Sequence, residues 1–183
     1  VYKSTDKGKT RVSISGNLPE NGTVHTLAQD FIRPELLFAG TEFGVFFTID
    51  NGSNWVQLKS GIPTIAIRDI AIQERESDLV LATFGRGFYI LDNYNPLREL
   101  SHELADKDAH IFDIKDALMY VQTSGKSNQG NTYFTSPNPA FGATFTYYLK
   151  DVPKTKKQIR IAEEKKLFKA GSPIPQPTWR ELQ

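Results

Sequence analysis

An internal repeat with a period of about 44 residues constrains the fold of this chain more than any other feature. The segments STDKGKTR (4–11) and TIDNGSNW (48–55) carry a hydroxyl residue, an aspartate and a glycine at matching positions: Ser4, Asp6 and Gly8 in the first, Thr48, Asp50 and Gly52 in the second. An aspartate can bond the backbone that follows it, and a glycine adopts positive φ without steric cost. Each segment is therefore predicted to be the turn of a β-hairpin, and the fixed offset predicts a repeat architecture.

The rest of the repeat predicts four strands in each unit. TVHTLAQDFIRPELLFAGTEFG aligns with AIRDIAIQERESDLVLATFGRG at an offset of 43, which places Leu36 on Leu79 and Ala39 on Ala82. The complete unit has predicted strands at 24–29, 36–41, 45–49 and 55–59. Residues 1–15 would supply only a third and a fourth strand, and residues 66–92 only the first three. Four short strands in roughly 45 residues is the size of one β-propeller blade; the alternative is a β-sandwich with accidental self-similarity.

The second turn carries a recognisable motif. The pattern Ser/Thr-x-Asp-x-Gly-x-x-Trp, completed by Trp55, resembles the Asp-box or BNR repeat of sialidases, of some glucan-cleaving propellers and of the sortilin (Vps10-type) propeller. The resemblance implies that the box lies between the third and fourth strands of a blade, that the aspartate fixes the turn and that the tryptophan packs between blades. The first copy has Arg11 in place of Trp55, and a third turn, predicted to begin at Asp92, lacks the glycine and the tryptophan.

The resemblance extends over about 150 residues. LATFGRGFYILDNYNPLREL and DAHIFDIKDALMY resemble the end of the propeller in large bacterial proteins of the sortilin-like or BNR-repeat glycosyl hydrolase group, and NPAFGATFTYYLKD resembles the link to a following β-sandwich. The expected fold is all-β: a partial propeller of four-stranded antiparallel blades over 1–95, a β-rich connecting segment over 96–136, and the start of a sandwich with a basic, partly helical tail over 137–183. Such a chain would be a fragment of a secreted or periplasmic protein, with the remainder of that protein as its partner.

Beyond the repeat, the sequence predicts a helical or turn connection in which Ser101 is the N-cap. Strands are predicted in AHIFDI (109–114), ALMYVQ (117–122) and ATFTYYL (143–149) because of their aromatic and β-branched residues.

Composition argues against several classes of partner and cofactor. The net charge is +1, and the basic residues gather in 150–169, which reads as a solvated helix or linker rather than a nucleic-acid-binding face. No apolar run is long enough to cross a membrane. The chain has no cysteine, so disulfides and thiolate metal sites are excluded. The three histidines, His25, His102 and His110, lie far apart in sequence, so neither a metal site nor a cofactor is expected.

Blade geometry predicts which residues meet on a ligand face. The turns opposite the Asp-boxes would contribute two acidic or basic side chains and two aromatic ones, and the start of the innermost strand of each unit would add three more polar side chains. These candidates are Glu42, Phe43, Phe84 and Arg86 in the turns and His25, Arg68 and Asp69 in the strands. For each of them, a solvated turn or an inter-blade hydrogen bond is the structural alternative.

Two functions follow from the resemblance. The first is hydrolysis of glycosidic bonds by the complete protein, which needs two carboxyl groups, for which Glu42 and Asp69 are the candidates in this chain. A sialidase would also need arginines for the substrate carboxylate, and Arg68 and Arg86 lie in adjacent predicted loops. The second is sortilin-like binding of a peptide or glycan without chemistry. The isolated fragment is expected to be inactive.

Overall fold

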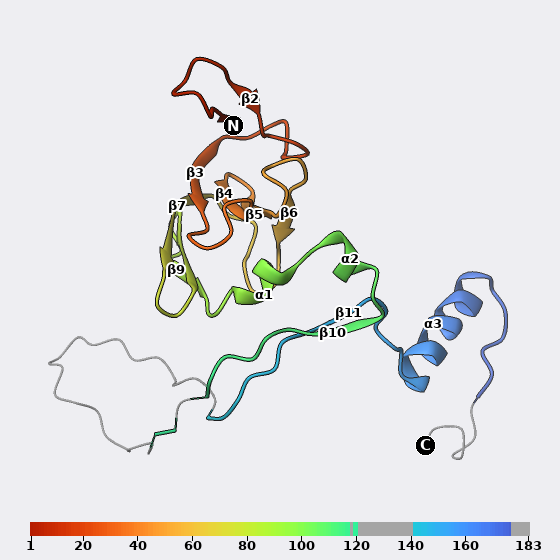
Figure 1. Ribbon diagram of the computed structural model, residues 1–183. Coiled ribbons are helices and arrows are strands. Elements are labelled where there is room, and N and C mark those ends of the chain that lie inside the picture. The colour runs from red at the N-terminus through yellow and green to blue at the C-terminus, as the bar shows by residue number, and fades with distance from the viewer. Residues whose placement is uncertain (118, 121–140, 177–183) are drawn as a thin grey trace, which may run out of the picture.

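The computed structural model describes residues 1–117, 119–120 and 141–176, and over these residues the chain is mostly β with little helix. Three small antiparallel sheets follow one another in the N-terminal half (Figure 1). Their strands are β1 (Tyr2–Lys3), β2 (Val12–Ser13), β3 (Val24–Gln29), β4 (Leu37–Thr41), β5 (Gly44–Thr48), β6 (Val56–Leu58), β7 (Ile67–Gln73), β8 (Asp78–Thr83) and β9 (Phe88–Leu91). No closed sheet occurs among the described residues.

The complete repeat unit forms a four-stranded sheet in the order β3-β4-β5-β6. Its strands fall within two residues of the predicted bounds. The pair β1-β2 repeats the pair β5-β6 at an offset of 44, since Tyr2 lies opposite Ser13 as Phe46 lies opposite Gln57. The prediction that residues 1–15 supply only two strands of a unit is confirmed.

The three-stranded sheet β7-β8-β9 matches the first three strands of the complete unit, but the predicted alignment of the second strand is wrong by one residue. Val24 pairs with Thr41, and its counterpart Ile67 pairs with Thr83. The offset is therefore 43 in the first strand, as predicted, but 42 in the second. Leu79 corresponds to Leu37 rather than to Leu36, because the loop before β8 is one residue shorter. The loop after β8 is one residue longer, which restores an offset of 43 in β9.

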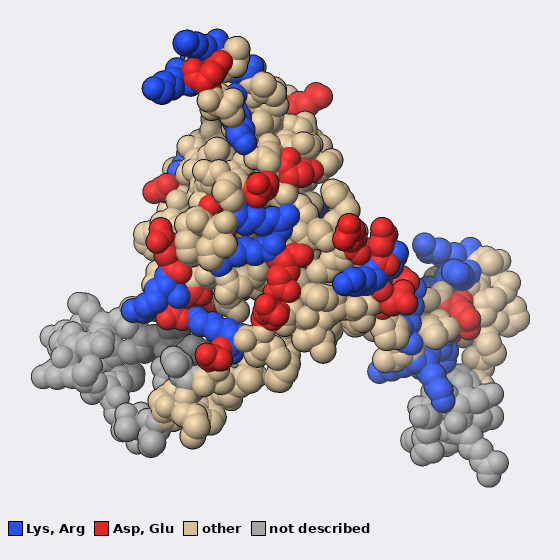
Figure 2. Space-filling view, in the orientation of Figure 1, with Lys and Arg blue, Asp and Glu red and all other residues tan. Residues whose placement is uncertain are grey.

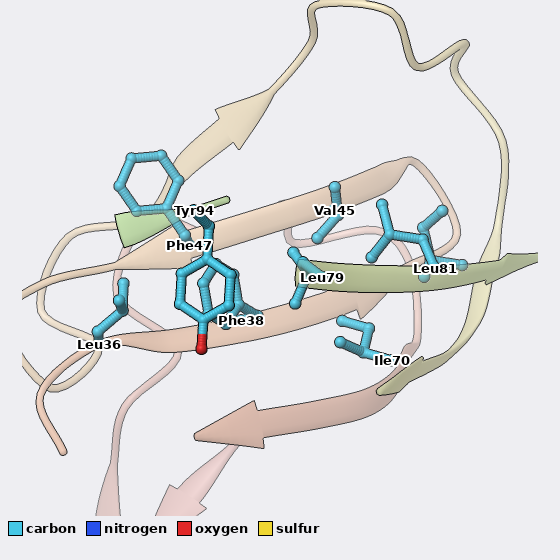
Figure 3. Close-up of a cluster of buried hydrophobic side chains, with 9 residues drawn as sticks. Leu36, Phe38, Val45, Phe47, Ile70, Leu79, Leu81 and Tyr94 are labelled. Carbon is cyan, nitrogen blue, oxygen red and sulfur yellow. The ribbon is translucent and has the colours of Figure 1, made fainter. Parts of the chain in front are cut away.

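With this correction, the sheets stack through the same faces at both junctions. Side chains of the first unit, Val1 and Ile14, pack against one face of the four-stranded sheet, whose buried residues are Leu37, Ala39 and Phe46. In the complete unit, Val45 and Leu58 correspond to Val1 and Ile14 and lie on the opposite face of the sheet. They pack against Leu79, Leu81 and Tyr89 of the three-stranded sheet, which correspond to Leu37, Ala39 and Phe46. Figure 3 shows the second of these cores, in which Phe38, Phe47 and Tyr94 supply the aromatic rings. The complete unit thus buries one face against the unit before it and the other against the unit after it.

The chain leaves the repeat at the end of β9. Tyr94 donates its backbone N–H to the Ser77 carbonyl as Asn51 does to the Glu35 carbonyl, and the positive φ of Asn51, 58°, recurs at Asn93, 50°. Among the described residues, Asp92 makes none of the side-chain hydrogen bonds by which Asp50 fixes its turn. In place of a fourth strand, the chain enters α1 (Asn95–Glu99).

The segment after α1 forms a short helix and a two-stranded sheet. Ser101 accepts a hydrogen bond from the Leu104 backbone N–H and caps α2 (His102–Ala105), as predicted. The strands β10 (Ala109–Ile111) and β11 (Tyr147–Leu149) pair antiparallel. This pairing links the predicted connecting segment, 96–136, to the predicted following domain, 137–183. The described part of 117–122 contains no strand, so the prediction for ALMYVQ is wrong there, and only the end of ATFTYYL is a strand. The predicted boundary at 136–137 lies outside the described residues.

The basic tail contains one regular helix, α3 (Lys156–Lys169). Thr155 and Gln158 form a capping box at its start, and no residue of the helix is buried. In Figure 2, basic side chains gather over α3, whereas acidic and basic side chains alternate over the sheets on the visible face. A solvated basic helix, as predicted from 150–169, is confirmed.

Candidate functional site

The two turns predicted from the repeat have the same hydrogen bonds. In the second, the Thr48 hydroxyl donates to Asp50 at 2.7 Å and accepts from the Gly52 N–H at 3.0 Å, while Asp50 accepts from the Asn54 N–H at 2.9 Å. In the first, Ser4, Asp6, Gly8 and Thr10 make the equivalent bonds at 2.9, 2.7 and 2.8 Å. Gly52 and Gly8 have φ of 89° and 87°. The aspartate therefore fixes the backbone of the turn in both copies.

Trp55 connects the second turn to the preceding unit. Its indole N–H donates to the Ile14 carbonyl at 2.9 Å, and its backbone N–H donates to the Asn17 side chain at 2.6 Å. The side chain is only 3% exposed. Gly52 lies so near that an added Cβ would stand 2.5 Å from the Ile14 carbonyl oxygen, a clash that excludes any larger residue. These contacts are structural, and they hold two sheets together.

Three of the candidate ligand-face residues lie together on the surface. The Arg68 guanidinium of β7 lies 3.3 Å from each ring nitrogen of His25 on β3, and 5.1 Å from the centre of the Phe84 ring. The Phe84 side chain is 66% exposed, and Arg68 is also exposed. The arrangement places a cation over one face of an exposed aromatic ring, and we call it the Arg68 cluster (His25, Arg68, Phe84).

The two candidate acids are in different surroundings. Asp69 accepts a hydrogen bond from the Thr26 hydroxyl at 3.3 Å and from the Ile70 N–H at 2.9 Å, so its carboxylate joins β3 to β7. Glu42 is exposed in the β4-β5 turn, and its side chain has no hydrogen bond or ion pair within the described part of the chain. Glu42 is therefore free to meet a ligand, whereas Asp69 already has partners.

The remaining candidates lie in the two short turns. Phe43 is 39% exposed and covers Gly22, where an added Cβ would meet its ring at 2.4 Å. Arg86 is exposed between two glycines of positive φ, Gly85 and Gly87. Phe43 thus has a packing role, and Arg86 stands on a turn whose backbone only glycine adopts easily.

A groove of about 640 Å³ runs along β3, beside the Arg68 cluster. His25, Thr26 and Leu27 form one wall, and the segment from Ser15 to Gly22 forms the other. His25 belongs to both the groove and the cluster, whereas Arg68 and Phe84 do not line the groove. The two features therefore meet at His25.

A buried polar network that the sequence analysis did not identify lies under the sheets. The Asp30 carboxylate is fully buried and accepts hydrogen bonds from the Tyr94 hydroxyl at 2.5 Å and from the Arg98 guanidinium at 2.7 to 3.1 Å. Arg98 also donates to Ser77 and Asn95. The turn signal at Asp30, which accepts the backbone N–H groups of Ile32 and Arg33, could be read from DFIRP, but nothing local links it to Arg98, 68 residues later.

The network holds both of its charges in the ionised form. Burial opposes the charged carboxylate of Asp30, but the hydrogen bonds from Arg98, Tyr94 and the backbone outweigh it and lower its pKa to about 2. Burial, and then the neighbouring carboxylate, raise the pKa of Tyr94. For Arg98, burial opposes the charge, yet the bonds to Asp30 raise its pKa. A carboxylate so fully paired serves to anchor α1 and is a poor proton donor or acceptor.

The described residues contain no group of three or more His, Asp or Glu side chains arranged to bind a metal ion. Within the same residues, none of the helices has both the length and the apolar character of a membrane span.

No family model matches the chain, and no curated protein and no solved structure shows significant similarity to it. Any assignment of function rests on the geometry and on the motif resemblance.

Proposed function

We propose that the three sheets are consecutive blades of an Asp-box β-propeller of the sortilin-like group, and that the surface over β3 and β7 binds an acidic glycan or peptide. Two observations support the propeller. The turns at Asp6 and Asp50 share one hydrogen-bond pattern, and successive sheets stack through equivalent faces. Accidental self-similarity in a sandwich would require neither.

The Arg68 cluster carries the proposal of ligand binding. An exposed aromatic ring offers a flat apolar surface for a sugar ring, and a guanidinium pairs with a carboxylate through two parallel hydrogen bonds. Arg68 and Phe84 present both groups together, 5.1 Å apart, and the groove along β3 extends the surface. A ligand that combines a ring and a carboxylate fits this chemistry better than a neutral or cationic one.

Hydrolysis of a glycosidic bond by the complete protein is the second candidate. The exposed carboxylate of Glu42 favours it, since a glycosidase needs an acid that can approach the substrate. The engagement of Asp69 by Thr26 counts against it, because the second carboxyl of the pair would first have to break that contact. Binding without chemistry is therefore the function that the geometry supports best. The parent protein would act outside the cytoplasm, as the family resemblance implies.

A titration of the isotope-labelled chain with 3′-sialyllactose, with lactose and with an acidic peptide tests the proposal. We expect chemical-shift changes at the side chains of His25, Arg68 and Phe84 with sialyllactose but not with the neutral sugar. Arg68→Gln should abolish the response. The matched control Arg75→Gln should not, since Arg75 is exposed in the turn between β7 and β8 and, within the described residues, pairs with Glu76 alone. A response to lactose as strong as that to sialyllactose would contradict a role for Arg68 in charge recognition, and a response to the peptide alone would exclude a glycan ligand.

A further inference from the structure

The sequence contains two Asn-Gly dipeptides, Asn21–Gly22 and Asn51–Gly52, which the structure places in opposite surroundings. Asparagine followed by glycine is the pair most prone to spontaneous deamidation, because glycine has no side chain to shield its backbone nitrogen. In this reaction the nitrogen attacks the side-chain carbonyl carbon of the preceding asparagine. The two pairs share the same intrinsic chemistry, so a difference in their reactivity comes from the fold.

Several contacts hold the pair in the second turn in place. The Gly52 N–H donates to the Thr48 hydroxyl at 3.0 Å, and Gly52 is buried. The Lys3 ammonium donates to the side-chain oxygen of Asn51 at 2.7 Å. The backbone of Gly52 packs so closely that an added Cβ would stand 2.5 Å from the Ile14 carbonyl oxygen. Attack by the Gly52 nitrogen therefore requires the turn to open first.

The pair before β3 is unrestrained by comparison. Asn21 and Gly22 are both exposed, and within the described part of the chain neither the Asn21 side chain nor the Gly22 N–H has a hydrogen-bond partner. The Phe43 ring that packs on Gly22 is itself 39% exposed, so it is able to move aside. The Gly22 nitrogen is therefore free to approach the Asn21 side chain.

We propose that Asn21 is a site of spontaneous deamidation and that the turn at Asp50 protects Asn51 from the same reaction. A base in solution removes the proton of the Gly22 N–H, and the nitrogen attacks Cγ of Asn21. A new C–N bond forms, the bond from Cγ to the side-chain nitrogen breaks, and that nitrogen takes up a proton and leaves as ammonia. Water then opens the resulting succinimide at one of its two carbonyl groups, which gives aspartate or isoaspartate at position 21.

The product changes one wall of the groove along β3. Glu20 and Gly22 both line this groove, so the new carboxylate at position 21 stands between two of its residues and beside an existing negative charge. The isoaspartate form also adds a methylene to the main chain, which changes the packing of Gly22 on Phe43. The modification lies beside the proposed ligand surface but does not depend on that proposal.

Prolonged incubation of the chain in mildly alkaline buffer, followed by mass spectrometry, tests the proposal. Cleavage after glutamate separates the two sites into the peptides 21–35 and 43–74. Asn21 should deamidate at least about tenfold faster than Asn51, because attack at Asn51 first requires a local opening that breaks at least one hydrogen bond. In concentrated guanidinium chloride the two sites should react at similar rates, since both precede glycine. Asn54, which precedes Trp55, is the internal control and should stay unmodified.

Two variants check the location and the protection. Asn21→Gln replaces an exposed side chain, so it should remove the fast reaction and leave the rate at Asn51 unchanged. Thr48→Val removes the hydroxyl that accepts from Gly52 but keeps the shape of the side chain, and it should raise the rate at Asn51 by about tenfold.

The comparison of the folded and denatured parent chain decides the proposal whether or not Thr48→Val folds. Equal rates at Asn21 and Asn51 in the folded chain, no reaction at Asn21, or a rate ratio that persists in guanidinium chloride would each overturn it. A folded Thr48→Val chain in which Asn51 reacts no faster would overturn the protective role of the turn.

Discussion

The indole N–H of Trp55 donates a hydrogen bond to the carbonyl of Ile14, a residue 41 positions earlier that directly follows β2 of the first unit. The ring is also part of the small core that joins the first unit to the second. One side chain therefore contributes both packing and a hydrogen bond to the same junction, and the loss of each can be measured separately.

Trp55→Ala should lower the free energy of unfolding by about 3–5 kcal/mol, because a large buried ring leaves a cavity. Trp55→Phe should cost less, about 1–3 kcal/mol, because most of the packing stays while the Ile14 carbonyl loses its donor. Tyr2→Ala is the control, since this aromatic residue of β1 lies outside that core, is 70% exposed and should change stability by under about 0.5 kcal/mol. Denaturant titrations measure all three. A Trp55→Ala chain as stable as the parent would refute the role of Trp55 at the junction.

The turn itself should be sensitive to the loss of its carboxylate. Asp50→Ala removes the acceptor for Thr48 and Asn54 and should cost about 0.5–2 kcal/mol, as the loss of a capping side chain does. Asp6→Ala removes the same bonds from a turn that is far more exposed, so the loss should be smaller. The two variants compared by thermal unfolding should keep that order; the reverse order would mean that burial of the turn is irrelevant to its strength.

The strands of the complete unit could be predicted from sequence because their signals are local. The turn at Asp50 has its own hydrogen-bonding residues, and the apolar runs on either side of it set the strands. The alignment of β8 failed for a physical reason. Leu36 and Leu79 match in type, but only the pairing of β7 with β8 shows that the loop before β8 is one residue shorter. A sequence offset cannot reveal which face of a strand a residue occupies once a loop has changed length.

The candidate surface was predicted only in part. His25, Arg68 and Phe84 meet because the starts of β3 and β7 are neighbours, which follows from the repeat. The network around Asp30 could not be predicted, since its partners Tyr94 and Arg98 lie after the point where the repeat ends. Long-range polar contacts of this kind carry no periodic signal.

Breaking the buried pair should destabilise the chain strongly. Arg98→Met leaves the Asp30 carboxylate buried without its cation and should cost about 3–5 kcal/mol. The double variant Asp30→Asn with Arg98→Met should lose less than the sum of the two single variants, because the second change removes a charge that the first left unpaired. Arg75→Met, which breaks an exposed pair with Glu76, is the control and should cost under about 1 kcal/mol. Additive losses in the double variant would show that the two residues do not act together.

The same pair should govern part of the acid sensitivity. The pKa of Asp30 in the folded chain, about 2, lies below the ordinary value of 3.8, so the folded state binds this proton less readily than the unfolded state. The stability that it contributes is therefore complete above about pH 4 and is lost as the pH falls toward 2, with a magnitude on the order of 2 kcal/mol. Urea titrations between pH 2 and 6 should show that the stability difference between the parent and Asp30→Asn shrinks over this interval. A difference that stays constant with pH would mean that the Asp30 pKa is not lowered by folding.

This chain should not hydrolyse aryl glycosides between about pH 4 and 8, the range in which a carboxylate pair works. Catalysis requires both acids to be held in position, and here Glu42 is unrestrained while Asp69 is bonded to Thr26. Release of the aryl alcohol, followed by absorbance, gives the rate. Measurable turnover that Glu42→Gln or Asp69→Asn abolishes would make hydrolysis the better assignment and displace binding as the main function.

The compensating loop lengths on either side of β8 bear on protein engineering. A consensus repeat averaged along one sequence offset would mix Leu36 with Leu79, two residues that belong to the same core instead of occupying equivalent places in successive cores. In the second strand, such a sequence would place on one face the side chains that belong on the opposite face. An idealised array built from this chain has to be averaged strand by strand, with each loop length chosen separately, if its units are to stack as these do.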